Sequence, residues 1–504
     1  MLKASNREIN STKIYLDAYP QQTTAGGQRY PDVNQAINNC VERGALITHY
    51  VGHGGEVGLA QERVVTIPEI QSWRNINAMN LFVSNTCEFT RYDDPGRVSA
   101  GEWISLNPNG GGIALMTTTR PVFFSVNTET GEAFYINVFK LGEDSTVMAM
   151  GEIIRRTKNQ SGTQENKRCF TLIGDPALKL AYPKYKVITD SINGNPIDNT
   201  QDTIKALSLV SVKGHIEDYF GNKLDAFNGF ISPTVYDKAK LEKTLGQDPT
   251  SFEVNYEVQK NIIYKGKATV SNGDFEYSFI VPKDISLSYG YGKLSHYANN
   301  DTDDAMGYDT SIIIGGINTN AIADSEGPLI EIYLNENSFV NGGMTNSTPT
   351  LIANVFDSSG INTVGSGIGH DITVILDNNN SAPIVLNDFY KADLDTYQSG
   401  EIRYHFPSID AGPHQLTFKI WDVNNNSSEQ TIDFVVQNDL NVSLDRVYNY
   451  PNPFTTTTEF IFEHNQACNE MDVQVQVFTI SGKLVKSIHE NVYTNGYRVN
   501  GIYW

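Results

Sequence analysis

The sequence predicts a multidomain protein in which an α/β domain is followed by a series of all-β domains. The chain has 504 residues, too many for one hydrophobic core, so about three or four domains are expected. Residues 31–180 alternate helix-like and strand-like segments, a pattern typical of a mostly parallel sheet covered by helices. From about residue 185 short alternating strands bounded by Gly, Asn, Asp and Pro replace the helical periodicity.

The α/β part is predicted to contain four strands separated by amphipathic helices. After Pro31, apolar residues at helical spacing and Gly44 as a C-terminal cap predict the first helix. Strands are expected at 45–51, 81–85, 111–117 and 169–174, with helices near 98–106, 129–141 and 146–158. The strands that normally precede such a unit are not found, so the chain is expected to be a fragment that begins inside this domain.

The rest of the chain is predicted to form β-sandwich domains. We place boundaries near residues 184, 325 and 440, which gives a β-sandwich at 185–325, an immunoglobulin-like sandwich at 326–440 and a partial immunoglobulin-like domain at 441–504. Apolar residues alternate along the expected strands, for example Leu416, Phe418 and Ile420. The last domain stops at Trp504 before its sheet is expected to close, so truncation is expected at this end too.

Composition and charge exclude several classes of function. The formal net charge is -21 and the pI is about 4.8, and no Lys/Arg cluster reverses this locally, so nucleic acid is not expected as a partner. No apolar run of about 18 residues predicts a membrane-spanning helix, and the first residues lack the pattern of a secretory signal. The cysteines lack the spacing of a disulfide scaffold or a zinc module: Cys40, Cys87, Cys169 and Cys468.

Two residues of chemical interest, His53 and Cys87, each directly follow a predicted strand. In open α/β sheets this carboxyl edge is where ligands bind. An imidazole beside a thiol makes a nucleophile, because a free cysteine thiol titrates near about pH 8.5 and is mostly protonated at neutral pH. The glycines around His53 allow close approach of a substrate, so the amides of Gly54 and Cys87 are predicted to form an oxyanion hole.

Alternative interpretations of the same residues stay open. A lone histidine in a glycine-rich turn and a free cysteine are often structural. A zinc site would use His49, His53 and Cys87, but four residues of strand separate the two histidines by about 13 Å, so no metal is expected there. Glu56 and Asp17 are candidates for orienting the imidazole, although acidic residues in loops are more often solvated.

Two further segments carry polar groups that suit binding. The segment 117–127 follows the third strand at the same sheet edge, and Glu88, Thr118, Thr119 and Arg120 are predicted to line a substrate pocket, although an ordinary loop fits equally well. The acidic loop 299–309 could hold a structural calcium ion, but it lacks the spacing of an EF-hand, and a solvated turn is the simpler interpretation. Its candidate ligands are Asp301, Asp303, Asp304 and Asp309.

Four motifs in order, ITHYVGHGG, LFVSNTCEF, GGIALMTTTRPV and FTLIGDPALKL, resemble the gingipain family of cysteine peptidases. The resemblance implies a caspase-like fold with His53 as the catalytic histidine and Cys87 as the nucleophile. Gly54 and Cys87 would supply the oxyanion donors, and no cofactor would be required. Within that family, the trailing β-domains and the phrases YGKLSHYA, GIGHDITVILD, VYNYPNPF and FTISGKLVKS are similar to sortases of type IX secretion in Bacteroidetes-type bacteria.

This second resemblance implies a specific reaction at the outer face of the cell. Such a sortase removes the C-terminal sorting domain of secreted cargo through a thioester on Cys87. It then passes the new carboxyl end to anionic lipopolysaccharide, next to outer-membrane components of the secretion system. A secreted endopeptidase that only hydrolyses proteins, and a non-catalytic surface scaffold, are the alternatives. The cleavage motif, the third catalytic group and the oligomeric state stay open.

Overall fold

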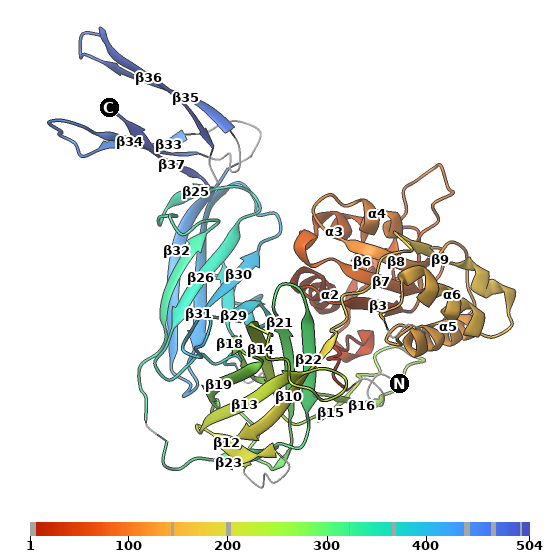
Figure 1. The fold of residues 1–504 in the computed structure, drawn as a ribbon. Coiled ribbons are helices and arrows are strands. Elements are labelled where there is room, and N and C mark those ends of the chain that lie inside the picture. Colours follow the sequence, from red (N-terminus) through yellow and green to blue (C-terminus); the bar gives the residue numbers. More distant parts are fainter. Residues whose placement is uncertain are drawn as a thin grey trace.

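The computed structural model describes residues 7–142, 146–197, 203–321, 323–364, 369–437, 444–464, 470–493 and 496–504. Within these ranges every α-helix lies before residue 161, and the remainder of the chain is built of strands from several sheets (Figure 1). None of the described helices is long and apolar enough to cross a membrane. The protein is therefore a mostly β, multidomain chain with its helices gathered near the N-terminal end.

A four-stranded sheet organises the α/β domain, as predicted. The strand order is β3-β7-β8-β9, in which β3 (Ile47–Val51), β7 (Asn80–Asn85) and β8 (Gly112–Thr118) are parallel. The last strand, β9 (Phe170–Ile173), runs antiparallel to β8. The first residue of β9 therefore lies beside the last residue of β8, because Thr118 pairs with Phe170.

Helices cover both faces of this sheet, which explains why β7 and β8 are apolar without alternation. Leu81 and Met116 pack into the core that includes α5 (Phe124–Asn137) and α6 (Met150–Gln160). Phe82 and Leu115 point into the opposite core, with α2 (Pro31–Arg43), α3 (Ile67–Ser72) and α4 (Ala100–Leu106). Shorter elements complete the domain: η1 (Leu16–Ala18), β1 (Gln22–Thr24), β2 (Gly27–Arg29), β4 (Gly54–Gly55), β5 (Gly58–Leu59), β6 (Val65–Thr66), η2 (Ile76–Ala78) and η3 (Glu165–Cys169).

Two predicted helices are displaced from their expected positions. The helix α5 begins five residues before the expected 129, because its first turn exposes Phe124 to solvent (82% exposed) and so breaks the apolar pattern. The helix α6 begins at Met150 and not at 146, because Val147 and Ala149 form isolated bridges with Leu141 and Lys179. The capping glycine of α2 is confirmed, since Gly44 has a φ of 90° and follows Arg43.

The sheet that follows closes on itself, which differs from the predicted two-sheet sandwich at 185–325. Its order is β11-β10-β13-β19-β18-β14-β21-β22, and β10 also pairs with β22 in parallel, Tyr185 with Ala305. The strands are β10 (Tyr185–Ile192), β11 (Asn195–Pro196), β13 (Leu209–Glu217), β14 (Gly229–Tyr236), β17 (Ile262–Lys265), β18 (Ala268–Ser271), β19 (Asp274–Ile280), β21 (Lys293–Asn299) and β22 (Asp304–Asp309). Closure leaves few free strand edges.

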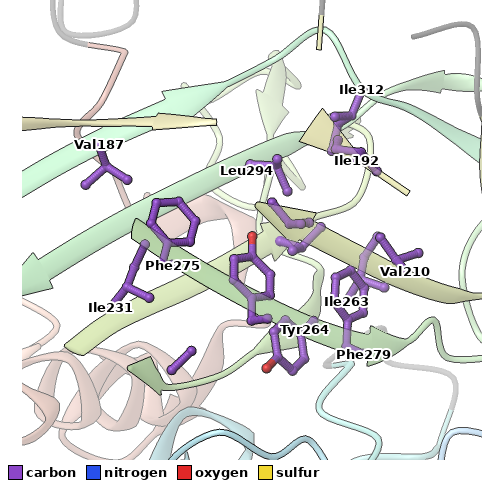
Figure 2. Packing of buried hydrophobic residues seen from close by; sticks show 14 of the residues in the cluster. Val187, Ile192, Val210, Ile231, Ile263, Tyr264, Phe275, Phe279, Leu294 and Ile312 are labelled. Carbon is purple, nitrogen blue, oxygen red and sulfur yellow. The ribbon is translucent and has the colours of Figure 1, made fainter. Parts of the chain in front are cut away.

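The interior of the closed sheet holds one apolar core (Figure 2). Side chains from strands far apart in sequence meet there, including Val187, Ile231, Phe275 and Leu294. Small satellite sheets flank it, formed by β12 (Thr203–Ala206), β20 (Gly290–Tyr291) and β23 (Ile313–Ile317), and by β15 (Lys240–Lys243) with β16 (Asn255–Val258).

Two facing sheets make up the next region, as expected of a sandwich. One contains β24 (Leu329–Leu334), β26 (Thr350–Phe356), β30 (Ser399–His405) and β29 (Tyr390–Ala392). The other contains β25 (Gly343–Thr345), β32 (Ser427–Val436), β31 (Gly412–Trp421), β27 (Thr373–Leu376) and β28 (Ile384–Val385), with η5 (Asn387–Phe389) beside them. Leu416, Phe418 and Ile420 are fully buried between the sheets, which confirms their predicted alternation.

The last strands form two small sheets. One joins β33 (Leu444–Tyr450), β34 (Glu459–His464) and β37 (Arg498–Tyr503), and the other pairs β35 (Glu470–Phe478) with β36 (Leu484–Tyr493). They share a small core around Phe462, Val499 and Ile502. Cys468 lies outside the described residues.

The α/β domain contacts both of the larger β regions. Asp17 accepts hydrogen bonds from the backbone N–H groups of Gly246 at 2.7 Å and Gln247 at 3.1 Å. At the C-terminal end of α2, Arg43 forms a 2.6 Å ion pair with Asp388 of η5. Asp17 therefore belongs to a contact with the closed-sheet region, and no contact among the described residues supports its candidate role in orienting His53.

One titratable residue in the closed sheet links stability to pH. His296 is 2% exposed, and its Nε2 atom lies 2.8 Å from the hydroxyl of Tyr277. Its Nδ1 atom has no hydrogen-bond partner in the part of the chain that the structure describes. Burial lowers the pKa of His296 to about 3, because a charged ring would be desolvated there.

We expect the closed-sheet region to lose stability on acidification from pH 7 to pH 5. The unfolded chain takes up a proton at His296 near pH 6.5 while the folded chain does not, so this residue alone costs about 2 kcal/mol at pH 5. Calorimetric unfolding at both pH values should show a smaller pH-induced shift in His296→Gln than in the wild type. Equal shifts in the two proteins would contradict the assignment.

Candidate active site

The pairing of β3 with β7 places His53 and Cys87 at the same edge of the sheet. In the parallel register Val51 lies beside Asn85, and His53 and Cys87 each come two residues later. The N–H of Gly52 donates to the carbonyl oxygen of Asn85 at 3.3 Å, which extends the contact past the strand ends. The two residues predicted to act together therefore leave neighbouring strands at the same level.

A small glycine-rich hairpin holds the His53 turn against the chain that carries Cys87. The strands β4 and β5 form this hairpin directly after His53. A Cβ atom on Gly54 would lie 2.7 Å from Thr86 Oγ1, so only glycine lets the hairpin approach the residue before Cys87 so closely. On its far side, the N–H of Ala100 at the start of α4 donates to Glu56 O at 2.7 Å.

The thiol of Cys87 contacts the backbone of Val122. Val122 N–H donates to Sγ at 3.4 Å, and Val122 O lies 3.6 Å from the same sulfur. Cys87 is a half-buried free thiol, whereas His53 is exposed. Among the described residues no hydrogen bond joins the imidazole of His53 to Cys87, so the structure shows the two residues at one edge without a bonded pair.

The residue after Cys87 adopts an unusual backbone conformation. Glu88 has a φ of 48°, which few residues with a side chain adopt, and its N–H donates to Arg120 O at 3.4 Å. The chain therefore turns sharply directly after Cys87. The carboxylate of Glu88 lies 3.6 Å from Arg91, so it faces a neighbouring cation and not Cys87.

Glu56 does not orient His53 in this structure. Its two carboxylate oxygens face Arg91 at 3.0 Å and Arg97 at 3.5 Å. These ion pairs connect the hairpin to the loop between Cys87 and α4. Glu56 is therefore a structural link between the two candidate catalytic segments, and no contact among the described residues supports its candidate role in positioning the imidazole.

The residues predicted to line a substrate pocket divide into two groups. Thr118 is fully buried, and its hydroxyl donates to Thr86 O at 2.5 Å, so it supports the loop of Cys87. Thr119 and Arg120 line a pocket of about 270 Å³ together with other residues of the same edge: Tyr92, Asp93, Arg168 and Cys169. Glu88 and Thr118 do not line it.

Arg120 is paired inside this pocket. Its guanidinium makes two hydrogen bonds to the carboxylate of Asp93, one of them at 2.9 Å. This pairing lowers the pKa of Asp93. Both side chains are nearly half exposed, so the pocket is polar and open to solvent.

His49 has hydrogen-bond partners on both sides of its ring. Its Nε2 atom lies 3.0 Å from Asn85 Oδ1, and its Nδ1 atom lies 3.2 Å from the hydroxyl of Tyr135 on α5. Burial lowers the pKa of His49. Because both ring nitrogens already have partners, His49 ties β3 to β7 and α5.

The acidic loop predicted for calcium is a hairpin turn between β21 and β22. Asp303 faces Lys184 at 3.2 Å, and Asp309 accepts hydrogen bonds from Ser311. The four aspartates therefore do not converge on one point. A different trio does lie close together within the described chain, Asp324, Asp357 and Asp422. That the protein binds a structural calcium ion stays a prediction, but the 299–309 loop does not bring its aspartates together to hold one.

Two residues near Cys87 were not predicted from the sequence: Val122, whose backbone contacts the sulfur, and Asn166, which bonds the residues on both sides of Val122. Val122 acts through its backbone, and no side-chain pattern reports such a contact. Asn166 lies on η3, and its side-chain amide bonds the backbone on both sides of Val122. The only sequence signal was the position of 117–127 directly after a strand of the sheet.

Comparison with known proteins gives a family for the first part of the chain. Residues 1–181 match the model described as Peptidase family C25. The predicted resemblance to the gingipain family is confirmed for this segment. The match is to a family of peptidases and covers less than half of the chain. The matched segment contains the whole four-stranded sheet and ends before β10, so we refer to it as the C25 domain.

Two solved structures are similar to parts of this chain. The dimeric latent PorU from Porphyromonas gingivalis is 32% identical, with a TM-score of 0.33, and the match covers 73% of this chain and 35% of that one. The Arg-specific cysteine proteinase gingipain R (RgpB) is 12% identical, with a TM-score of 0.28, over 54% of this chain and 56% of that one. The chain thus spans about a third of the length of PorU. No curated protein matches it.

The packing of α4 in the C25 domain leads to a testable expectation. A Cβ atom on Gly101 would lie 1.8 Å from Thr90 Oγ1 and 2.9 Å from Phe89 O, three residues or fewer beyond Cys87. Gly101→Ala should destabilise the domain by about 1–3 kcal/mol, because overpacking outweighs the gain in helix propensity.

Thermal unfolding measured by calorimetry checks this expectation. Gly55→Ala is the matched control, because nothing lies within 4 Å of a Cβ atom there. A Gly101→Ala protein that unfolds at the wild-type temperature would show that α4 does not restrain the Cys87 loop in this way.

Proposed function

We propose that the C25 domain is a cysteine endopeptidase in which Cys87 is the nucleophile and His53 the general base. The observation that carries this proposal is the parallel register of β3 and β7, which brings both residues out of the sheet at the same level. The exposed imidazole of His53 and the half-buried free thiol leave both groups accessible to a bound peptide. The sharp backbone turn at Glu88 supports this role, because such conformations cluster at active sites.

The proposed reaction begins with attack of the Cys87 sulfur on the scissile carbonyl carbon. His53 accepts the thiol proton and then donates it to the leaving amine, so that a thioester remains on Cys87. The developing oxyanion accepts hydrogen bonds from the N–H groups of Gly54 and Cys87. The close approach of Gly54 to Thr86 is consistent with this placement.

We further propose that this peptidase acts as a sortase on cargo of type IX secretion. The acyl group of the thioester passes to a nucleophilic group of anionic lipopolysaccharide, and the thiol of Cys87 is released. The support comes from the motifs in the trailing β regions, together with the family of the C25 domain. The proposal places the protein at the outer face of the outer membrane, next to other components of that secretion system.

We also propose specific fold types for three regions of the chain. We assign a caspase-like architecture to residues 1–184 and immunoglobulin-like folds to 326–440 and 441–504. No described sheet mixes strands from the two sides of residues 184, 325 or 440, which supports these boundaries.

Substitution of either catalytic residue should abolish cleavage of a cargo protein that carries its C-terminal domain. Cys87→Ala and His53→Ala are each expected to lower the rate by about a thousandfold or more, because the thioester then forms slowly or not at all. Cleavage is followed by intact mass spectrometry. Cys40→Ser is the matched control, since Cys40 is a free thiol on α2 outside the sheet edge. A Cys87→Ala protein that cleaves at the wild-type rate would contradict the assignment of Cys87 as the nucleophile.

The mass of the cargo product separates transfer from hydrolysis. With anionic lipopolysaccharide present, the sortase proposal expects the new carboxyl end to carry the acceptor. A product with a free carboxyl end under all conditions would instead favour a secreted endopeptidase.

A further inference from the structure

The segment 118–123 is bonded at every residue to the chain around Cys87 or to η3. Thr118 O accepts from Thr90 N–H at 3.0 Å, and Thr119 N–H donates to Cys169 O at 3.0 Å. Arg120 O accepts from the N–H of Glu88. These hydrogen bonds hold the segment 118–123, called the strip below, along the loop that contains Cys87. The position of the strip determines which backbone groups contact the sulfur of Cys87.

One side chain holds this strip on both sides of Val122. Asn166 Nδ2 donates to Pro121 O at 2.9 Å, and Asn166 Oδ1 accepts from Phe123 N–H at 2.9 Å. A side-chain amide that bonds a carbonyl and an N–H at once fixes both the position and the direction of the peptide between them. The residue between them is Val122.

We propose that Asn166 is a positioning residue that holds the backbone of Val122 against the sulfur of Cys87. Val122 O lies 3.6 Å from Sγ and accepts from the thiol, and Val122 N–H lies 3.4 Å from Sγ and donates to the thiolate. The strip thus offers a partner to the sulfur in either protonation state. The meaning of this arrangement for catalysis rests on the proposed function, in which Cys87 is the nucleophile.

The reactivity of the Cys87 thiol depends on the backbone donor of Val122 and on the charged side chains of the surrounding elements. A hydrogen bond to an ionised acceptor is stronger than one to a neutral acceptor, so the Val122 N–H favours the thiolate over the thiol. Replacement of Asn166 by alanine changes none of the charged or titratable side chains on the surrounding elements. These are His53, Glu88, Asp93, Arg120, Arg168 and Cys169. A change in thiol reactivity would therefore follow from the moved backbone.

The rate of alkylation of Cys87 by iodoacetamide, measured by peptide mass spectrometry from pH 5 to pH 10, tests this role. In Asn166→Ala the midpoint of the rate against pH should move upward, and the rate at pH 7 should fall about three- to tenfold. The plateau at high pH should equal that of the wild type, because access to the sulfur does not change. Peptide-level detection separates Cys87 from the other cysteines.

Two further variants make the outcome decisive. Gln164→Ala is the matched control, because Gln164 also lies beside η3 but its side chain donates to Ser125 Oγ at 3.3 Å and, within the described residues, bonds no residue of 118–123. It should keep the wild-type profile. Asn166→Asp keeps an acceptor for Phe123 N–H but loses the donor to Pro121 O and adds a negative charge, so its midpoint should move at least as far. It also decides the test if Asn166→Ala does not fold.

The proposal is overturned if the folded Asn166 variants give the wild-type profile, or if their rates fall equally at every pH. The second result would mean that only access to the sulfur had changed. Alkylation needs no peptide substrate, so a wild-type protein that cleaves no cargo would contradict the proposed function and leave this measurement valid. In an active wild type, Asn166→Ala should lower kcat with little change in KM.

Discussion

The in-register parallel pairing of β3 with β7 is the constraint on which the candidate site depends. It sets His53 and Cys87 at one level of the sheet edge, although the two residues belong to different loops. Side-chain contacts reinforce the pairing. His49 on β3 bonds Asn85 and Tyr135, and Glu56 in the hairpin after His53 bonds Arg91 beyond Cys87. Movement of either strand would separate the imidazole from the thiol.

Around this pair of residues, the loops are held in place mainly by contacts of the backbone. Glycines let the chain approach closely at Gly54 and Gly101, and the strip 118–123 runs along the loop of Cys87 with a hydrogen bond at each residue. The site is thus an edge of fixed loops on a rigid sheet, an arrangement that suits chemistry on an extended peptide. The polar pocket near Arg120 lies on the side of Cys87 away from β3.

The strand and helix order of the α/β domain could be predicted from periodicity, because a sheet covered on both faces leaves clear apolar runs such as 81–85. The two residues at its edge could be predicted for the same reason. Contacts between distant segments could not. Nothing in the sequence showed that Arg120 pairs with Asp93, that Asp17 belongs to an interdomain contact, or that β10 closes the second sheet on β22. Each depends on tertiary register, which single-sequence patterns do not report.

The contacts of Asp17 and Arg43 show that the C25 domain, which ends near residue 184 in the sequence, packs against the β regions that follow it. Its N-terminal segment rests on backbone amides of the closed-sheet region, and its first long helix is fastened to η5. A recombinant fragment cut at the linker would keep every residue of the sheet edge and yet expose two surfaces that the whole chain covers. For this protein the smallest unit worth isolating therefore extends at least through the sandwich of β24–β32.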